Sequence, residues 1–123
     1  MTPTEIRTSI TCGTHAKATQ FNYSGSLEFG INLHFETSSV KVAASFLQAI
    51  LTEFRSKTVP GGFSMTDPKY CGLGIWVRDH SRELNGGIAL TPRHASFIAA
   101  ILRDANKLTS STEGTAVILQ FRD

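Results

Sequence analysis

Apolar residues recur at intervals of three and four in two stretches of the chain, and this spacing predicts two amphipathic helices. The first covers residues 43–54 and the second covers 92–108. The apolar stripe consists of Ala43, Phe46, Leu47, Ile50, Leu51 and Phe54 in the first helix, and of His94, Phe97, Ile98, Ile101, Leu102, Ala105 and Leu108 in the second.

The two predicted helices share a nine-residue phrase. AASFLQAIL at 43–51 and HASFIAAIL at 94–102 are identical at six positions and exchange Leu for Ile at a seventh. Duplication of a strand–helix unit and the common demands of helix-on-sheet packing both explain this similarity. Under either explanation the two helices present nearly the same face to the core.

Hydroxyl residues ahead of each helix predict where it begins. Thr91 followed by Pro92 fits an N-cap with proline at the first helical position, where its missing N–H costs nothing. The Thr-Ser-Ser of 37–39 offers similar caps to the first helix.

Alternation of apolar and polar residues predicts strands in other stretches. The clearest alternation lies at 27–35, where every second residue from Leu27 to Phe35 is apolar. A similar pattern at 72–77, continuing to Arg78, predicts another strand. Further strands are expected at 6–12, 19–23 and 115–121, with short extra strands near 63–65 and 86–90. Turn-forming residues separate these elements at 59–63, 66–69, 84–87 and 110–114, and the Asn-Gly-Gly within 84–87 favours a tight turn between two short strands.

The predicted order is roughly β-β-α-β-α-β, which is typical of an α+β fold. We expect one domain over residues 1–123, built as a two-layer sandwich. In this arrangement a mostly antiparallel sheet of about four to six strands carries the two helices on one face.

The composition indicates a packed core and limits the kinds of partner that the protein is expected to bind. The chain is 41% hydrophobic and 18% charged, with a net charge of +2 that is too small to indicate nucleic-acid binding. No cationic leader or long apolar run is present, so we expect a cytoplasmic protein without membrane contact. Cys12, Cys71 and the four His lack the spacing of a metal site, and no phosphate-binding loop is present, so no metal, cofactor or disulfide is expected.

The sheet face opposite the helices is the first candidate site. Under the predicted strand register it carries Asn32, His34, Trp76, Arg78 and Gln120. Glycines between them leave room above the sheet, and these side chains hold planar or anionic ligands or form subunit contacts. A solvated face, a homodimer interface and a ligand site remain open as alternatives.

Residues 76–94 are the second candidate site, because polar groups are dense there and the segment ends where a helix begins. Arg82, Thr91, Arg93 and His94 form a candidate anion site, since a helix N-terminus attracts negative charge. His94 also lies on the apolar stripe, where a packed and hydrogen-bonded histidine is the simpler explanation.

The function expected from these features is a non-catalytic binding or accessory module. It self-associates as a homodimer and holds a protein partner or a small anionic ligand. The alternative is a small hydrolase- or transferase-type enzyme, with His80 or His94 as general base and with Arg78 and Arg93 clamping an anionic substrate. The consecutive Asp79, His80 and Ser81 cannot form a catalytic relay among themselves, because neighbouring side chains diverge.

Overall fold

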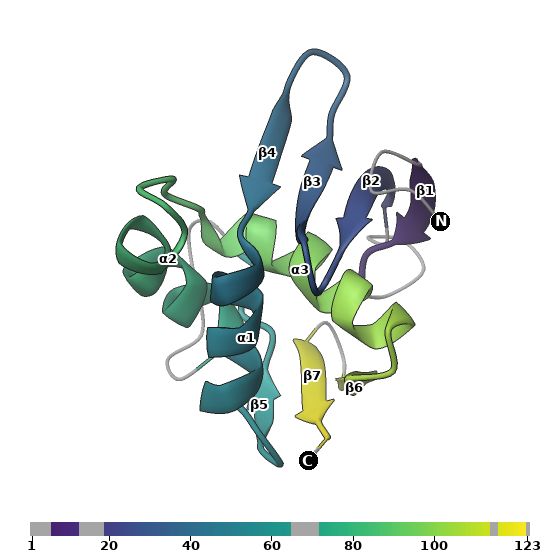
Figure 1. Cartoon of the computed structure of the whole chain (residues 1–123). Coiled ribbons are helices and arrows are strands. Elements are labelled where there is room, and N and C mark those ends of the chain that lie inside the picture. The colour runs from purple at the N-terminus through teal and green to yellow at the C-terminus, as the bar shows by residue number, and fades with distance from the viewer. Residues whose placement is uncertain (1–5, 13–18, 65–71, 114–115, 123) are drawn as a thin grey trace.

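The computed structural model describes residues 6–12, 19–64, 72–113 and 116–122 and shows a mixed α+β fold (Figure 1). The elements are β1 (Arg7–Ile10), β2 (Gln20–Ser26), β3 (Gly30–His34), β4 (Ser39–Val42), α1 (Ala44–Glu53), β5 (Thr58–Pro60), α2 (Leu73–Leu84), α3 (Pro92–Asp104), β6 (Leu108–Glu113) and β7 (Ala116–Phe121). Every strand pairing in these ranges is antiparallel, so the predicted class and the predicted pairing are confirmed.

The strands form two sheets, and the expectation of one shared sheet is wrong. The first sheet has the order β1-β2-β3-β4, and the second has the order β5-β7-β6. Helix α3 contacts β1 of the first sheet and β6 of the second, while α1 contacts β3 (Figure 1). The strands that follow α1 and α3, which are β5 and β6, therefore each pair with the C-terminal strand β7 instead of extending the first sheet.

Helices α1 and α3 confirm the two predicted amphipathic segments. Phe46, Leu47 and Ile50 are buried in α1, and their counterparts at the matching positions of α3 are buried as well. Helix α3 is buried on more of its circumference than α1, because it packs against α2 and against both sheets. It ends at Asp104, and Leu108 begins β6 instead of extending the helical stripe, since Asn106 reverses the chain with a φ of 65°.

The N-terminal caps differ between the two helices. Thr91 caps α3 as predicted, and Pro92 occupies its first turn. The N-cap of α1 is Ala43, which makes no side-chain capping bond. Of the hydroxyl residues at 37–39, Thr37 and Ser38 lie in the connection from β3 to β4 and Ser39 begins β4, so their predicted capping role is wrong.

The segment predicted as a strand at 72–77 is the start of helix α2. Alternation over six residues is too short to distinguish a strand from a helix. Extended to 84, the same segment shows helical spacing, with Leu73, Val77 and Ser81 buried on one side. The Asn-Gly-Gly that follows closes this helix, so it does not join two strands, and 86–90 contains no strand.

Asn85 explains why the turn after α2 is so tightly held. Its buried side chain accepts from the backbone N–H of Ala43 at 2.6 Å and donates to the carbonyls of Lys41 at 3.0 Å and Ile88 at 3.3 Å. The end of α2 is thereby fastened to the junction between β4 and α1.

The predicted strand at 27–35 is shortened by a turn. Residues 27–29 form the turn between β2 and β3, and Phe29 is 73% exposed instead of facing the core. Gly25 and Gly30 on either side adopt φ values of 96° and 98°, which other residues avoid. These two glycines therefore allow the chain to turn between β2 and β3. The alternation of apolar and polar residues does not reveal this turn.

Three short strands were not predicted, namely β4, β5 and β6. Residues 110–113 belong to β6 instead of a turn, and residues 63–64 are not part of a strand. The predicted turn at 66–69, together with Cys71, residue 65 and residues 114–115, lies outside the described residues. The strands predicted at 6–12, 19–23 and 115–121 correspond to β1, β2 and β7.

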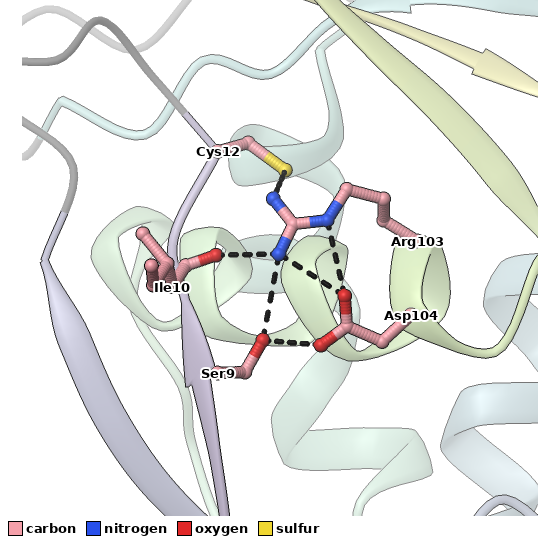
Figure 2. Close-up of polar contacts among 5 residues, drawn as sticks. All are labelled: Ser9, Ile10, Cys12, Arg103 and Asp104. Carbon is pink, nitrogen blue, oxygen red and sulfur yellow. Dashed lines mark hydrogen bonds and ion pairs between the residues drawn. The ribbon is translucent and has the colours of Figure 1, made fainter.

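Strand β1 is fastened to the end of α3 by a polar cluster (Figure 2). The Arg103 guanidinium donates to the carbonyl of Ile10 at 2.7 Å and to the buried Cys12 Sγ at 3.6 Å. Ser9 Oγ donates to Asp104, whose other oxygen accepts from Arg103 at 3.1 Å. The N-terminal strand is thus joined through side chains to a helix about ninety residues further along the chain.

None of the helices in the described ranges is long and apolar enough to cross a bilayer.

Candidate functional site

A pocket of about 530 Å³ opens where β2 begins, β3 ends and α3 begins. The elements meet there because antiparallel pairing places the start of β2 beside the end of β3, with Asn22 opposite His34. The first turn of α3 completes the wall with Thr91, Arg93 and His94. Residues from three elements therefore share one concave site.

Three phenylalanine rings form the apolar wall of this pocket. Phe97 of α3 meets the ring of Phe21 at 5.0 Å and the ring of Phe35 at 5.3 Å, with interplanar angles of 69° and 68°. These edge-to-face contacts hold the rings against each other and leave an apolar surface of fixed shape. Such a surface accommodates an apolar or planar part of a ligand.

His94 is held by the capping box at the start of α3. Its Nδ1 accepts a hydrogen bond of 3.0 Å from the backbone N–H of Thr91, while the Thr91 hydroxyl accepts one of 3.4 Å from the backbone N–H of His94. An accepting Nδ1 carries no proton, so this bond assigns the neutral ring with its proton on Nε2. Burial, and then the charge of neighbouring Arg93, lower the pKa of His94 below its usual 6.5. Neutral His94 can therefore donate one hydrogen bond from Nε2.

Arg93 and Glu36 supply opposite charges at the edge of the pocket. Both side chains are exposed, and within the described residues neither forms an ion pair. Arg93 lies in the first turn of α3, and Glu36 lies just beyond the end of β3, after Phe35. The pocket thus carries one cationic and one anionic group that are both available to a ligand.

His34 connects the pocket to a buried serine. His34 lines the pocket from β3, and its Nε2 lies 2.8 Å from the Oγ of Ser24 on the neighbouring strand β2. Ser24 is only 4% exposed. A histidine nitrogen at hydrogen-bonding distance from a serine hydroxyl is the arrangement that activates a serine nucleophile. The same contact also serves a second role, which is to fix the orientation of the histidine ring.

The predicted sheet-face set does not share one face. Asn32 and His34 lie on the outer side of β3, whereas Trp76 and Arg78 lie on helix α2 and Gln120 lies on β7 in the other sheet. The premise of a single polar sheet face is therefore wrong, because it depended on a strand at 72–77. Of these five residues, only His34 lines the pocket.

The predicted anion set is largely brought together. Thr91, Arg93 and His94 line the pocket, whereas Arg82 lies exposed on α2 and is not part of the lining. The pocket also contains Phe35 and Glu36, which no pattern in the sequence marks as site residues. Their position directly after a strand was the available clue, but nothing in the sequence places the end of that strand beside α3.

The consecutive Asp79, His80 and Ser81 diverge, as expected, although they lie on a helix. Ser81 is buried and accepts from the N–H of Leu90 at 2.7 Å, and Asp79 pairs with Arg78 at 2.9 Å. His80 Nδ1 donates to the carbonyl of Trp76 at 2.9 Å.

Trp76 packs within an aromatic cluster instead of on an open face. Its ring stacks on His80 with centroids 4.3 Å apart and also contacts Phe46 and Phe54 of the α1 region at 5.8 Å. Phe54 in turn stacks on Phe121 of β7 at 5.2 Å. The tryptophan thus joins α2 to the core, and it is not among the residues that line the pocket.

Among the described residues, no three His, Cys, Asp or Glu side chains are grouped so as to hold a metal ion. No family model, curated protein or solved structure matches this chain.

Proposed function

We propose that this protein is a non-catalytic binding module that holds a small molecule with an anionic group in the strand-end pocket. The observation that carries the proposal is the pocket itself, whose volume of about 530 Å³ lies in the range of small-molecule sites. An accessory role, in which the bound module also contacts a protein partner, belongs to the same proposal.

The groups around the pocket suit an anion attached to an apolar body. Arg93 offers a guanidinium that is free of ion pairs within the described residues, and the Nε2 of neutral His94 offers a further donor. The rings of Phe21, Phe35 and Phe97 offer apolar contact. Arginine binds carboxylates and phosphates through paired N–H groups, which makes it the expected anchor for the ligand.

Titration of isotope-labelled protein with 2-naphthoate, followed by NMR, tests this function. We expect saturable shifts at the start of β2, the end of β3 and the first turn of α3. Arg93→Gln should weaken binding about fivefold or more, because a partly exposed ion pair contributes on the order of 1 kcal/mol. The matched control is Arg82→Gln, which should bind like the unsubstituted protein. The absence of saturable shifts, or an affinity that both substitutions weaken equally, would contradict the proposal.

Self-association as a homodimer is the second part of the proposal. Strand β1 lies at the edge of its sheet. Its last residue, Ile10, is 51% exposed, and Ile6, which directly precedes the strand, is 62% exposed. Exposed apolar residues on an edge strand favour pairing with a second copy. Sedimentation equilibrium should show a dimer that Ile10→Lys converts to monomer, whereas Thr8→Lys on the same strand should have a smaller effect. A monomer at all concentrations would contradict this part.

A cytoplasmic location is also proposed, with support from the free thiol of buried Cys12, because unpaired thiols are typical of reducing compartments. Fractionation of the producing cells tests it, and recovery with the membrane or outside the cell would contradict it.

The contact between Ser24 and His34 favours a second candidate function, an esterase-type hydrolase. Ser24 Oγ would attack the ester carbonyl while His34 Nε2 takes the hydroxyl proton, and the alcohol would leave with that proton. Water would then release the acid from the acyl-serine, with Arg93 holding an anionic substrate.

Hydrolysis of p-nitrophenyl acetate distinguishes this candidate from simple binding. Ser24→Ala and His34→Gln should both reduce the rate to that of buffer, while His80→Gln should retain it. A rate unaffected by Ser24→Ala would eliminate the serine mechanism and leave His34 as a residue of the binding pocket.

A further inference from the structure

Among the described residues, two charged side chains of opposite sign line the pocket without forming an ion pair. Together they limit the chemical class of the ligand more than a single cationic anchor would. Arg93 and Glu36 both line the pocket, both are exposed, and within the described ranges neither is neutralised by an ion pair. If the site had evolved for a simple anion, the Glu36 carboxylate would repel it. The two charges instead provide separate partners for an acidic and a basic group.

His94 does not add a positive charge to this balance. His94 accepts at Nδ1 from Thr91, and its pKa is lowered by burial and by Arg93, so its ring is neutral at pH 7. His34 is engaged by Ser24 at 2.8 Å. With the ring of His94 neutral, the formal charges of Arg93 and Glu36 cancel, so a multiply charged anion such as a phosphate monoester lacks adequate compensation.

One wall of the pocket is apolar. Phe97 lies between Phe21 and Phe35 in edge-to-face contact with each, and all three rings line the pocket. An aromatic or large apolar group gains most from such a wall. The site therefore combines an apolar wall with one cationic and one anionic group at its edge.

We infer that the ligand is a zwitterion with an aromatic or large apolar side group, of the chemical class of an aromatic α-amino acid. This inference rests on the proposed binding function. The ligand carboxylate pairs with Arg93, its ammonium group pairs with Glu36, and its ring contacts the three phenylalanines. The volume of about 530 Å³ also leaves room for a larger molecule of the same class.

Three probes that share a phenylethyl group test the inference. L-Phenylalanine carries both charges, 3-phenylpropanoate carries only the carboxylate, and 2-phenylethylamine carries only the ammonium group. Titration calorimetry or NMR of the unsubstituted protein should show that L-phenylalanine binds at least about fivefold tighter than either single-charge probe.

Charge-neutralising variants assign each end of the ligand. Arg93→Gln should weaken L-phenylalanine and 3-phenylpropanoate about fivefold and leave 2-phenylethylamine unchanged. Glu36→Gln should have the opposite selectivity. Arg82→Gln and Glu28→Gln, which neutralise exposed charges outside the pocket lining, serve as matched controls and should change none of the three affinities.

The outcomes separate this inference from the function on which it rests. If 3-phenylpropanoate binds as tightly as L-phenylalanine and Glu36→Gln weakens neither, the ligand is a simple anion and only the inference is overturned. If none of the three probes binds, both the inference and the proposed function are overturned.

Discussion

His94 illustrates how one residue couples local geometry to a property that can be measured. Its Nδ1 accepts the N–H of Thr91, so protonation of that nitrogen would place two donors against each other. Burial and Arg93 lower its pKa from 6.5 for the same physical reason, since the folded protein disfavours the charged ring. The capping box and the neutral ring therefore support one another.

This coupling predicts a pH dependence of the free energy of unfolding. The ring titrates near 6.5 in the unfolded chain and at a lower pH in the folded protein, so between these values the unfolded chain binds more protons. The contribution of His94 is thus complete above pH 6.5 and is lost as the pH falls through the folded pKa. Urea unfolding between pH 5 and pH 8 should show this loss.

His94→Gln is the matched variant for that measurement, because glutamine at this position can complete a capping box without titrating. It should flatten the pH profile over the same range. His94→Ala should instead cost about 1 kcal/mol at pH 8, the typical value of a lost cap. A profile that is unchanged in His94→Gln would show that other groups cause the dependence.

The candidate site shows at residue scale which parts were predictable. Thr91, Arg93 and His94 are adjacent in sequence and surround a helix start that Thr-Pro identifies, so their grouping could be predicted. Glu36 joins them only because the end of β3 lies beside α3, which is a tertiary relation. Trp76 was misplaced because six alternating residues fit two kinds of element.

At the scale of elements, the close packing of α2 against the loop after β5 depends on a glycine. A Cβ on Gly74 would overlap the carbonyl oxygen of Gly62 and lie 3.1 Å from the side chain of Pro92. The backbone N–H of Gly74 also donates to the carbonyl of Gly61 at 2.8 Å. Because the obstructing atom is backbone, a side chain here would require the helix or the loop to move.

Gly74→Ala should therefore destabilise the fold by about 2 kcal/mol or more, although alanine is normally the better helix former. Gly86→Ala provides the comparison, because its Cβ would meet nothing within 4 Å and only its φ of 64° is unfavourable. Thermal unfolding of the two variants should show the larger loss for Gly74→Ala. Equal losses would mean that the loop yields easily.

The length of each element explains how far its type could be predicted. Helices α1 and α3 each show several turns of regular spacing, and both were predicted to within a few residues. Strands β4 and β5, of 4 and 3 residues, are too short to show a period. The 6-residue strand β6 is mostly polar, because it is an exposed edge strand, and its sequence resembles a turn.

At the scale of the whole molecule, the polar cluster of Figure 2 joins β1, the first strand of the first sheet, to the C-terminal end of helix α3. Arg103 provides donors to Ile10, Cys12 and Ser9, and Asp104 accepts from Ser9. These contacts span about ninety residues of sequence, so no local pattern could have predicted them. They hold β1 where apolar contact alone would be weak, because alternate residues of this strand face solvent.

Arg103→Ala should lower the free energy of unfolding by about 1–3 kcal/mol, since it leaves partners in β1 and Cys12 without a donor. Arg55→Ala, an exposed arginine after α1, should change it by less than about 0.5 kcal/mol. Denaturant titration followed by circular dichroism measures both. A loss no larger than that of Arg55→Ala would show that β1 is held by its backbone pairing with β2.

Helix α3 begins in the pocket and contacts β1 and β6 along its course, so both sheets depend on the same thirteen-residue element. Its buried amide protons can then reach deuterated solvent only when the entire fold opens, and they should be the slowest in the molecule to exchange. A ligand at its first turn would retard exchange in strands that it never touches, by an equal free-energy increment in each.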